Sequence, residues 1–222
     1  MSSAGVSSAG AGRRLVIWRH GETAHNVGGI WQGQLDTDLS ERGVGQVREA
    51  AAVLASLGPS RIVSSDLRRA ACTASELASV TGLPVGYDVR LREIHVGSWQ
   101  GMSQGDVAER FPAEHAALGR GEDLRRGEHG ESVAHVQERV LSAARDLLAE
   151  LAPGQLAVVA THGVTARTLT AALVGLDQQT AWLVLAGLRN CHWAELEERR
   201  TGWRLVTWNA GVSTSVRSTS DR

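Results

Sequence analysis

The chain has 222 residues, of which 42% are hydrophobic, and its 23 basic and 24 acidic residues give a formal net charge of −1. This size and composition fit one globular domain with a sizeable core. A nearly neutral chain has no overall field that would attract nucleic acid or an anionic membrane, so we expect neither as a partner. All 23 basic residues are arginine, which excludes a Walker A loop and lysine-based Schiff-base chemistry.

Simple counts exclude further classes of protein. Cys72 and Cys191 are too few for a disulfide scaffold or a cysteine-based zinc site. The histidines do not show the paired spacing of metal ligands, so we expect no metal ion and no cofactor. No apolar run approaches the roughly 18 residues of a membrane span. The expected location is therefore the cytoplasm.

The two ends of the chain differ in composition from the rest. Residues 1–12 are small and flexible and predict a disordered leader, and residues 213–222 predict a flexible polar tail. Between them, residues 13–212 alternate between helical and strand periods and form a single predicted domain.

Apolar periodicity and turn signals define the expected elements of this domain. In chain order they are a strand at 15–18, helices from about 40 to 57 and from about 66 to 81 with a strand at 61–63 between them, a strand at 85–87, a short helix at 106–110, a long helix at 133–151, a strand at 156–160, a helix at 163–173, and strands at 191–196 and 204–208. Segment 112–130 contains four glycines and is expected to be a mobile loop. Such alternation predicts a three-layer α/β/α sandwich with a mostly parallel central sheet.

The first predicted strand runs directly into the sequence Arg-His-Gly-Glu-Thr at residues 19–23. Arg19 offers a rigid fork of donors that suits phosphate oxygens. His20 offers a nitrogen that is largely neutral, and hence nucleophilic, near pH 7. The alternative interpretation is a buried Arg-His pair that satisfies backbone carbonyls.

Two other predicted strands end in side chains of related chemistry. The strand at 61–63 leads through Ser65-Asp66 to Arg68, and the strand at 156–160 leads to His162. The ends of parallel strands lie along one edge of a sheet, so two arginines and two histidines are expected to converge there. Phosphoryl transfer needs mainly positioning and charge stabilisation around the phosphoryl oxygens, which such a set supplies.

These motifs, taken together, resemble the histidine phosphatase (phosphoglycerate mutase-like) superfamily. The resemblance extends over residues 13–210 and rests on residues 19–23 with Asn26, on 64–70, on Leu91-Arg92-Glu93 and on His162-Gly163. It implies catalysis through a phosphohistidine, with His20 as the nucleophile and Glu93 as general acid and then general base. Further residues are implied to hold the phosphoryl group or the substrate: Arg19, Arg68, His162, Thr23, Asn26, Gln32, Gly33 and Gly163.

Within this superfamily, residues 26–40 and the terminal tryptophan-containing segment are most similar to the branch that removes phosphate from glucosyl-3-phosphoglycerate. The expected partner is thus a small phosphorylated substrate. A phosphoglycerate mutase is an alternative, but Val96 and Gln104 occupy the places of that enzyme's tyrosine and lysine. A broad-specificity sugar-phosphate phosphatase and an alpha-ribazole phosphatase are further alternatives.

Segment 112–131 has two possible roles. Its charged residues Arg120, Arg125, Arg126 and His129 would bind a glycerate carboxylate, or they are a solvated charge run. Trp31 and Trp99 would flank a sugar, or they belong to the core. The remaining tryptophans are expected in the core or on the surface of a homodimer.

Two remote alternatives come from other classes of protein. Residues 101–105 match the Gly-x-Ser-x-Gly elbow of serine esterases, but no buried strand is predicted before Ser103, which is expected to cap a helix instead. A non-catalytic phospho-binding module is the other alternative. The joint presence of five residues speaks against it: His20, Arg19, Arg68, Glu93 and His162.

Overall fold

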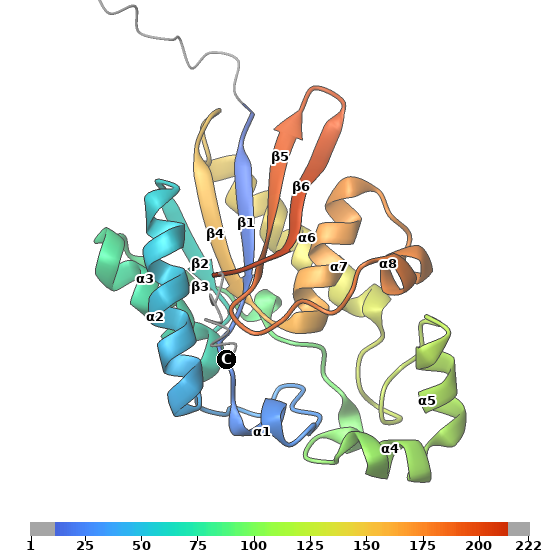
Figure 1. The fold of residues 1–222 in the computed structure, drawn as a ribbon. Coiled ribbons are helices and arrows are strands. Elements are labelled where there is room, and N and C mark those ends of the chain that lie inside the picture. Colours follow the sequence, from blue (N-terminus) through green and yellow to red (C-terminus); the bar gives the residue numbers. More distant parts are fainter. Residues whose placement is uncertain (1–11, 213–222) are drawn as a thin grey trace, which may run out of the picture.

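The computed structural model describes residues 12–212, which form a mixed six-stranded sheet with helices on both faces (Figure 1). The strands are β1 (Arg14–Arg19), β2 (Arg61–Ser64), β3 (Val85–Tyr87), β4 (Leu156–Thr161), β5 (Trp193–Arg199) and β6 (Gly202–Ala210). They lie in the order β3-β2-β4-β1-β5-β6. The first four strands are parallel to one another, β5 is antiparallel to β1, and β6 is antiparallel to β5. The predicted α/β/α sandwich is confirmed. The predicted leader before Gly12 and the predicted tail at 213–222 lie outside the described residues.

The helices divide between the two faces of the sheet (Figure 1). On one face lie α2 (Glu41–Ser56) and α3 (Arg68–Thr81), and on the other lie α6 (Val133–Glu150) and α7 (Gly163–Val174). The shorter helices are α1 (Ala24–Val27), α4 (Gln104–Arg110), α5 (Pro112–Gly119) and α8 (Gln178–Val184), and 3₁₀ turns span Val89–Leu91 and Gly97–Trp99.

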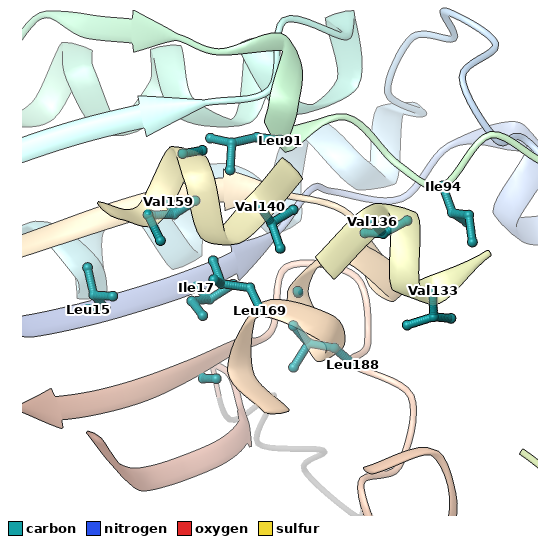
Figure 2. Close-up of a cluster of buried hydrophobic side chains, with 14 of the residues drawn as sticks. Leu15, Ile17, Leu91, Ile94, Val133, Val136, Val140, Val159, Leu169 and Leu188 are labelled. Atoms are coloured by element: carbon teal, nitrogen blue, oxygen red, sulfur yellow. The ribbon is translucent and has the colours of Figure 1, made fainter. Parts of the chain in front are cut away.

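The central strand β1 shows why the sheet is covered on both faces. Leu15 and Ile17 point into the cluster beneath α6 and α7, which Figure 2 shows, whereas Val16 and Trp18 point into the cluster beneath α2 and α3. All four side chains are at most 1% exposed. A strand buried on both sides must be apolar throughout, as this one is, and each such side chain contributes about 1.5–3 kcal/mol to stability.

Segment 112–130 corrects one prediction, because its first part is the helix α5 and not a loop. Pro112 occupies the first turn, where its fixed φ favours a helix and its missing N–H costs nothing. Alanines and a leucine follow, and these residues have high helix propensity. The glycines therefore correctly predicted a loop only for the part of the segment that follows α5. Helix α8, which Asp177 caps, was also missed.

Serine side chains cap the starts of α2, α4 and α6, as predicted for Ser103. Ser40, Ser103 and Ser132 each accept a hydrogen bond from the backbone N–H three residues ahead. Asp66 precedes α3 but does not cap that helix. Its carboxylate instead accepts two hydrogen bonds from the guanidinium of Arg92, at 2.7 and 2.5 Å.

Candidate active site

Three parallel strands end side by side and bring the predicted motifs together. In the β1–β4 register Arg19 lies opposite Thr161, and in the β2–β4 register Ser64 lies opposite Ala160. His20 N–H continues the pairing by donating to Thr161 O at 2.9 Å. His20 and His162 are therefore neighbours, with ring centroids 5.2 Å apart. A pocket of about 150 Å³ opens at this edge, lined by Arg19, His20, Asn26, Ile30, Trp31, Gln32, Gly33, Arg69, Glu93, Ile94, Val96, Gln104, Arg126 and Val164.

The imidazole of His20 is buried and held in one tautomer. Its Nδ1–H donates to Gly21 O at 2.6 Å, which leaves the lone pair of Nε2 free. Burial, followed by the charges of Arg69 and Arg19, holds the pKa of His20 well below its ordinary value. His20 is thus neutral at physiological pH, the state that a nitrogen nucleophile requires.

Arg19 and His162 are two further buried polar residues at these strand ends. Arg19 donates from Nη1 to Leu188 O at 2.5 Å, and its buried Nε has no partner among the described residues. His162 contacts Ser65 Oγ through Nε2 at 2.9 Å, while its buried Nδ1 has no partner there either. Burial, then the charge of Arg69, holds the pKa of His162 well below its ordinary value. Each side chain thus keeps one buried polar atom without a partner among the described residues, and of the two only Arg19 lines the pocket.

The second arginine of the site is Arg69 and not Arg68. Arg69 is 1% exposed, lines the pocket and donates to Leu35 O and Gly33 O at 2.6 and 2.8 Å. Arg68 lies outside the pocket on the surface, where it forms ion pairs with Asp36 and Asp38. Helical periodicity would have distinguished them, because Arg69 is four residues before the buried Thr73 and so shares its face of α3.

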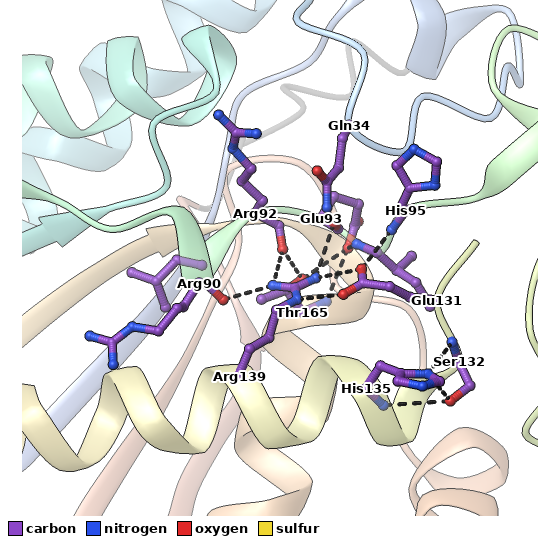
Figure 3. A network of polar contacts seen from close by, with 12 residues as sticks. Gln34, Arg90, Arg92, Glu93, His95, Glu131, Ser132, His135, Arg139 and Thr165 are labelled. Atoms are coloured by element: carbon purple, nitrogen blue, oxygen red, sulfur yellow. Dashed lines mark hydrogen bonds and ion pairs between the residues drawn. The ribbon is translucent and has the colours of Figure 1, made fainter. Parts of the chain in front are cut away.

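Glu93 lines the pocket and interacts with the start of α7. Its Oε1 accepts from the N–H groups of Ile94 and Thr165, and its Oε2 accepts from Val164 N–H at 3.2 Å. Arg139 of α6 fixes the backbone nearby by donating to Glu93 O at 3.1 Å, as Figure 3 shows. The carboxylate thus has a fixed position in the wall of the pocket.

Arg139 connects the backbone of Glu93 to the loop that precedes α6. Its guanidinium also donates to the carbonyls of Arg90 and Arg92 and forms an ion pair with Glu131 at 2.8 Å (Figure 3). Glu131 in turn accepts from His95 N–H at 2.8 Å. Arg139 therefore holds both segments that border Glu93.

The predicted substrate-binding residues divide into two groups. Asn26, Gln32 and Gly33 line the pocket, whereas Thr23 and Gly163 do not. Thr23 Oγ1–H lies 3.1 Å from both Asn26 Oδ1 and Gln32 Oε1, and so holds these two amides. Gly163 begins α7 beside the Arg19 guanidinium.

Sequence reasoning missed Asn190, which precedes β5. Its Nδ2 donates to His20 O, Gly21 O and Asn26 Oδ1 at 3.1 to 3.2 Å. Asn190 is about 170 residues away from these partners in the chain, and no local pattern signals such a contact.

The pocket is also lined by Arg126, the one residue of the four charged candidates in segment 112–131 that lines it. Arg120, Arg125 and His129 are exposed. Trp31 also lines the pocket, whereas Trp99 is fully buried in the core and packs against Trp31 with ring centroids 5.5 Å apart. Only Trp31 is positioned to contact a ligand.

Residues 12–212 do not form the sites of the other classes of protein considered above. Within these residues, no group of three or more histidine, cysteine or acidic side chains is placed to hold a metal ion. No helix in the same range is both long and apolar enough to span a bilayer. The serine elbow is not formed, because a 3₁₀ turn at Gly97–Trp99 precedes Ser103 and the hydroxyl caps α4.

The sheet, the strand-end histidines and the buried arginines define a phosphoryl-transfer site of a known class. The profile of the histidine phosphatase superfamily (branch 1) matches residues 15–211. The chain belongs to this superfamily and is a phosphatase.

Its relatives include two mycobacterial enzymes. The chain is 43% identical to a glucosyl-3-phosphoglycerate phosphatase of Mycolicibacterium vanbaalenii over 90% of this chain and 96% of that one. It is 41% identical to the enzyme of the same name from Mycobacterium tuberculosis over 91% and 97% of the two chains. The solved structure of a mycobacterial glucosyl-3-phosphoglycerate phosphatase complexed with VO3 superposes with a TM-score of 0.84 at 40% identity, covering 90% of this chain and all of that one.

Proposed function

We propose that this chain hydrolyses glucosyl-3-phosphoglycerate through a covalent intermediate on His20. The observation that carries the proposal is the state of His20, a buried neutral imidazole that keeps a free lone pair on Nε2 and lines one pocket with Arg19 and Arg69. The substrate is supported by the mycobacterial relatives, which match nearly the whole chain and carry that substrate in their names.

In the first step, His20 Nε2 attacks the phosphorus atom and forms a P–N bond. The bond between phosphorus and the ester oxygen breaks, and Glu93 gives its proton to that oxygen as the alcohol leaves. The guanidinium groups of Arg19 and Arg69, together with Nδ1 of His162, hold the phosphoryl oxygens. These donors are preorganised in a buried site, where they stabilise the charge of the transition state without reorganising.

In the second step, the Glu93 carboxylate takes a proton from water, and the water oxygen attacks phosphorus. The P–N bond breaks, inorganic phosphate leaves, and His20 and protonated Glu93 are restored for the next turnover. Glu93 is supported in both roles because it lines the same pocket as His20 and its position is fixed from two sides.

The test is to follow the phosphoryl group itself. Wild-type protein mixed with glucosyl-3-phosphoglycerate and quenched rapidly should gain one phosphoryl group on the peptide that contains His20, detected by mass spectrometry under conditions that preserve phosphohistidine. The His20→Ala variant should neither gain it nor turn over. A variant that keeps a near-normal rate would show that the covalent mechanism is wrong.

We further propose that the protein acts in the cytoplasm as a homodimer. Strand β6 forms one edge of the sheet, and Val206 on it is 46% exposed. Such an edge is a surface to which a second copy can add. Light scattering during size-exclusion chromatography tests the assembly, because a particle with the mass of one chain would contradict it. Cell fractionation tests the location.

A further inference from the structure

The guanidinium of Arg126 has no function in the chemistry described above. Arg126 is fully buried, and its Nε, Nη1 and Nη2 all lack a hydrogen-bond partner among the described residues. A buried charge is normally paired, because an unpaired one is costly. Arg126 also lines the pocket that contains His20 and Glu93. These features indicate a group that awaits an anionic ligand.

The surroundings of Arg126 hold it in place without satisfying its charge. Its guanidinium carbon lies 5.7 Å from the ring centroid of Trp31 and 5.8 Å from that of Trp182. The adjoining loop is tightly packed, since a Cβ on Gly127 would lie 2.3 Å from Val96 O and one on Gly130 would lie 2.3 Å from Arg126 O. A side chain fixed in this way loses little entropy when it binds a ligand.

Arg126 differs from Arg19 and Arg69 in its effect on His20. The charges of Arg69 and Arg19 lower the pKa of His20, whereas Arg126 is not among the groups that shift it, and two guanidinium groups match the two charges of a phosphate ester. Against the charges of Glu93, Asp123 and Glu131, burial lowers the pKa of Arg126 to about 10. Arg126 therefore remains charged at neutral pH and provides one more positive charge than the phosphate requires.

We propose that Arg126 determines specificity by binding a carboxylate on the same molecule as the scissile phosphate. A planar guanidinium fork fits the two oxygens of a carboxylate, and its single charge matches that of one. The substrate class is then phosphate monoesters of short hydroxy acids. This inference rests on the proposed function for its choice of pocket, but it makes a separate claim about the second anion.

Two compounds that differ only at this position test the wild-type protein. D-3-phosphoglycerate and D-glycerol 3-phosphate (sn-glycerol 1-phosphate) have the same arrangement at C2 and differ only in having a carboxylate or a hydroxymethyl group. A buried charge pair is worth enough for kcat/KM to favour the carboxylate compound by about 30-fold or more. Equal rates, or a preference for glycerol 3-phosphate, would overturn the inference while leaving the phosphatase activity established.

Binding to the His20→Ala protein provides the same comparison without turnover. Calorimetry should show tighter binding of the carboxylate compound to this variant, again by about 30-fold or more. If that preference is present but wild-type protein hydrolyses neither compound, the proposed function fails and the inference stands. If turnover occurs and no binding preference is found, the inference fails and the function stands.

A matched pair of variants locates the effect in one side chain. Arg126→Met should lower kcat/KM for 3-phosphoglycerate by about 30-fold or more while changing that for glycerol 3-phosphate and p-nitrophenyl phosphate only a few-fold. The adjacent Arg125 is exposed, so Arg125→Met should change none of the three. Equal losses by Arg126→Met on all three substrates would overturn the inference. Circular dichroism checks the fold of each variant. If Arg126→Met does not fold, the kinetic comparison on wild-type protein and the binding comparison on His20→Ala protein still test the inference.

Discussion

The phosphoryl site depends on which face of α3 carries each of two adjacent arginines. Arg69 points into the core side of the helix and reaches both the pocket and the carbonyls of Gly33 and Leu35. Arg68 points outward to Asp36 and Asp38. Since successive residues on a helix are about 100° apart, neighbours in sequence acquire different environments.

This difference predicts unequal effects for the same conservative change. Arg69→Lys keeps a positive charge but loses the fork, so we expect kcat/KM to fall by about 100- to 1,000-fold, as for the loss of one transition-state donor. Arg68→Lys should change it less than about 3-fold, since exposed ion pairs contribute little. Steady-state kinetics on one substrate measures both. Equal losses would contradict the placement of Arg69 at the phosphate.

Glu93→Gln tests proton transfer, because glutamine keeps the shape of the side chain but cannot donate a proton. General acid–base catalysis contributes about 100- to 10,000-fold, and we expect a loss of that size in kcat/KM for an alkyl phosphate. The loss in kcat/KM should be much smaller for p-nitrophenyl phosphate, whose leaving group needs no proton. Comparing kcat/KM for the two substrates measures this difference, because kcat/KM reports the steps up to release of the leaving group and not the later hydrolysis of phospho-His20, which is common to both. A similar loss on both substrates would assign Glu93 a binding role instead.

Among the elements, α2 supports the catalytic loop through glycine contacts. A Cβ on Gly43 would lie 2.1 Å from Glu22 O, and one on Gly21 would lie 2.7 Å from Gly43 O. The start of the helix therefore packs directly against the backbone that follows His20. This close approach explains a glycine in the first turn of a helix, where it otherwise weakens the helix.

Two glycines of α2 form a matched pair for testing this contact. Gly43→Ala should lower the free energy of unfolding by about 1–3 kcal/mol through overpacking, and should reduce kcat by displacing the loop. A Cβ on Gly45 would have nothing within 4 Å, so Gly45→Ala should raise stability by about 0.5–1 kcal/mol with unchanged kcat. Urea unfolding and steady-state kinetics measure both variants. A stable and fully active Gly43→Ala protein would contradict the proposed support.

For the whole molecule, the two buried histidines predict how stability depends on pH. The pKa values of His20 and His162 are held well below their ordinary value, mainly by burial. Below about pH 6.5 the unfolded chain therefore binds protons that the folded protein does not, and stability falls with falling pH by up to about 1.4 kcal/mol per pH unit for each histidine. Carboxylates of the unfolded chain titrate near pH 4, mostly below this range.

Denaturant unfolding at pH 7.5 and pH 5.5 checks this prediction. The wild-type protein should be less stable at pH 5.5, and His20→Gln should lose less stability between the two pH values because one of the two histidines is gone. Equal stability of the wild-type protein at both pH values would show that the buried histidines do not remain neutral as the folded state requires.

Local patterns in the sequence were sufficient to predict the alternation of strands and helices and the residues at which the strands end. The apolar run before His20 and the run before His162 each identify a buried strand, because a strand covered on both faces has no polar alternation. The predicted cap at Ser103 is also confirmed, since a cap depends only on residues within one turn of helix. The position of His20 and His162 at one edge follows from parallel pairing of these strands.

The tertiary structure alone decided features that depend on segments far apart in the chain. The choice of Arg69, the contact of Asn190 with the His20 loop and the unpaired burial of Arg126 all arise where separate elements pack together. The sequence by itself determined which chemical groups stand at the strand ends, because strand and cap signals are local. Which arginines enter the pocket was decided only by packing, because burial is a property of the surrounding elements and not of the residue.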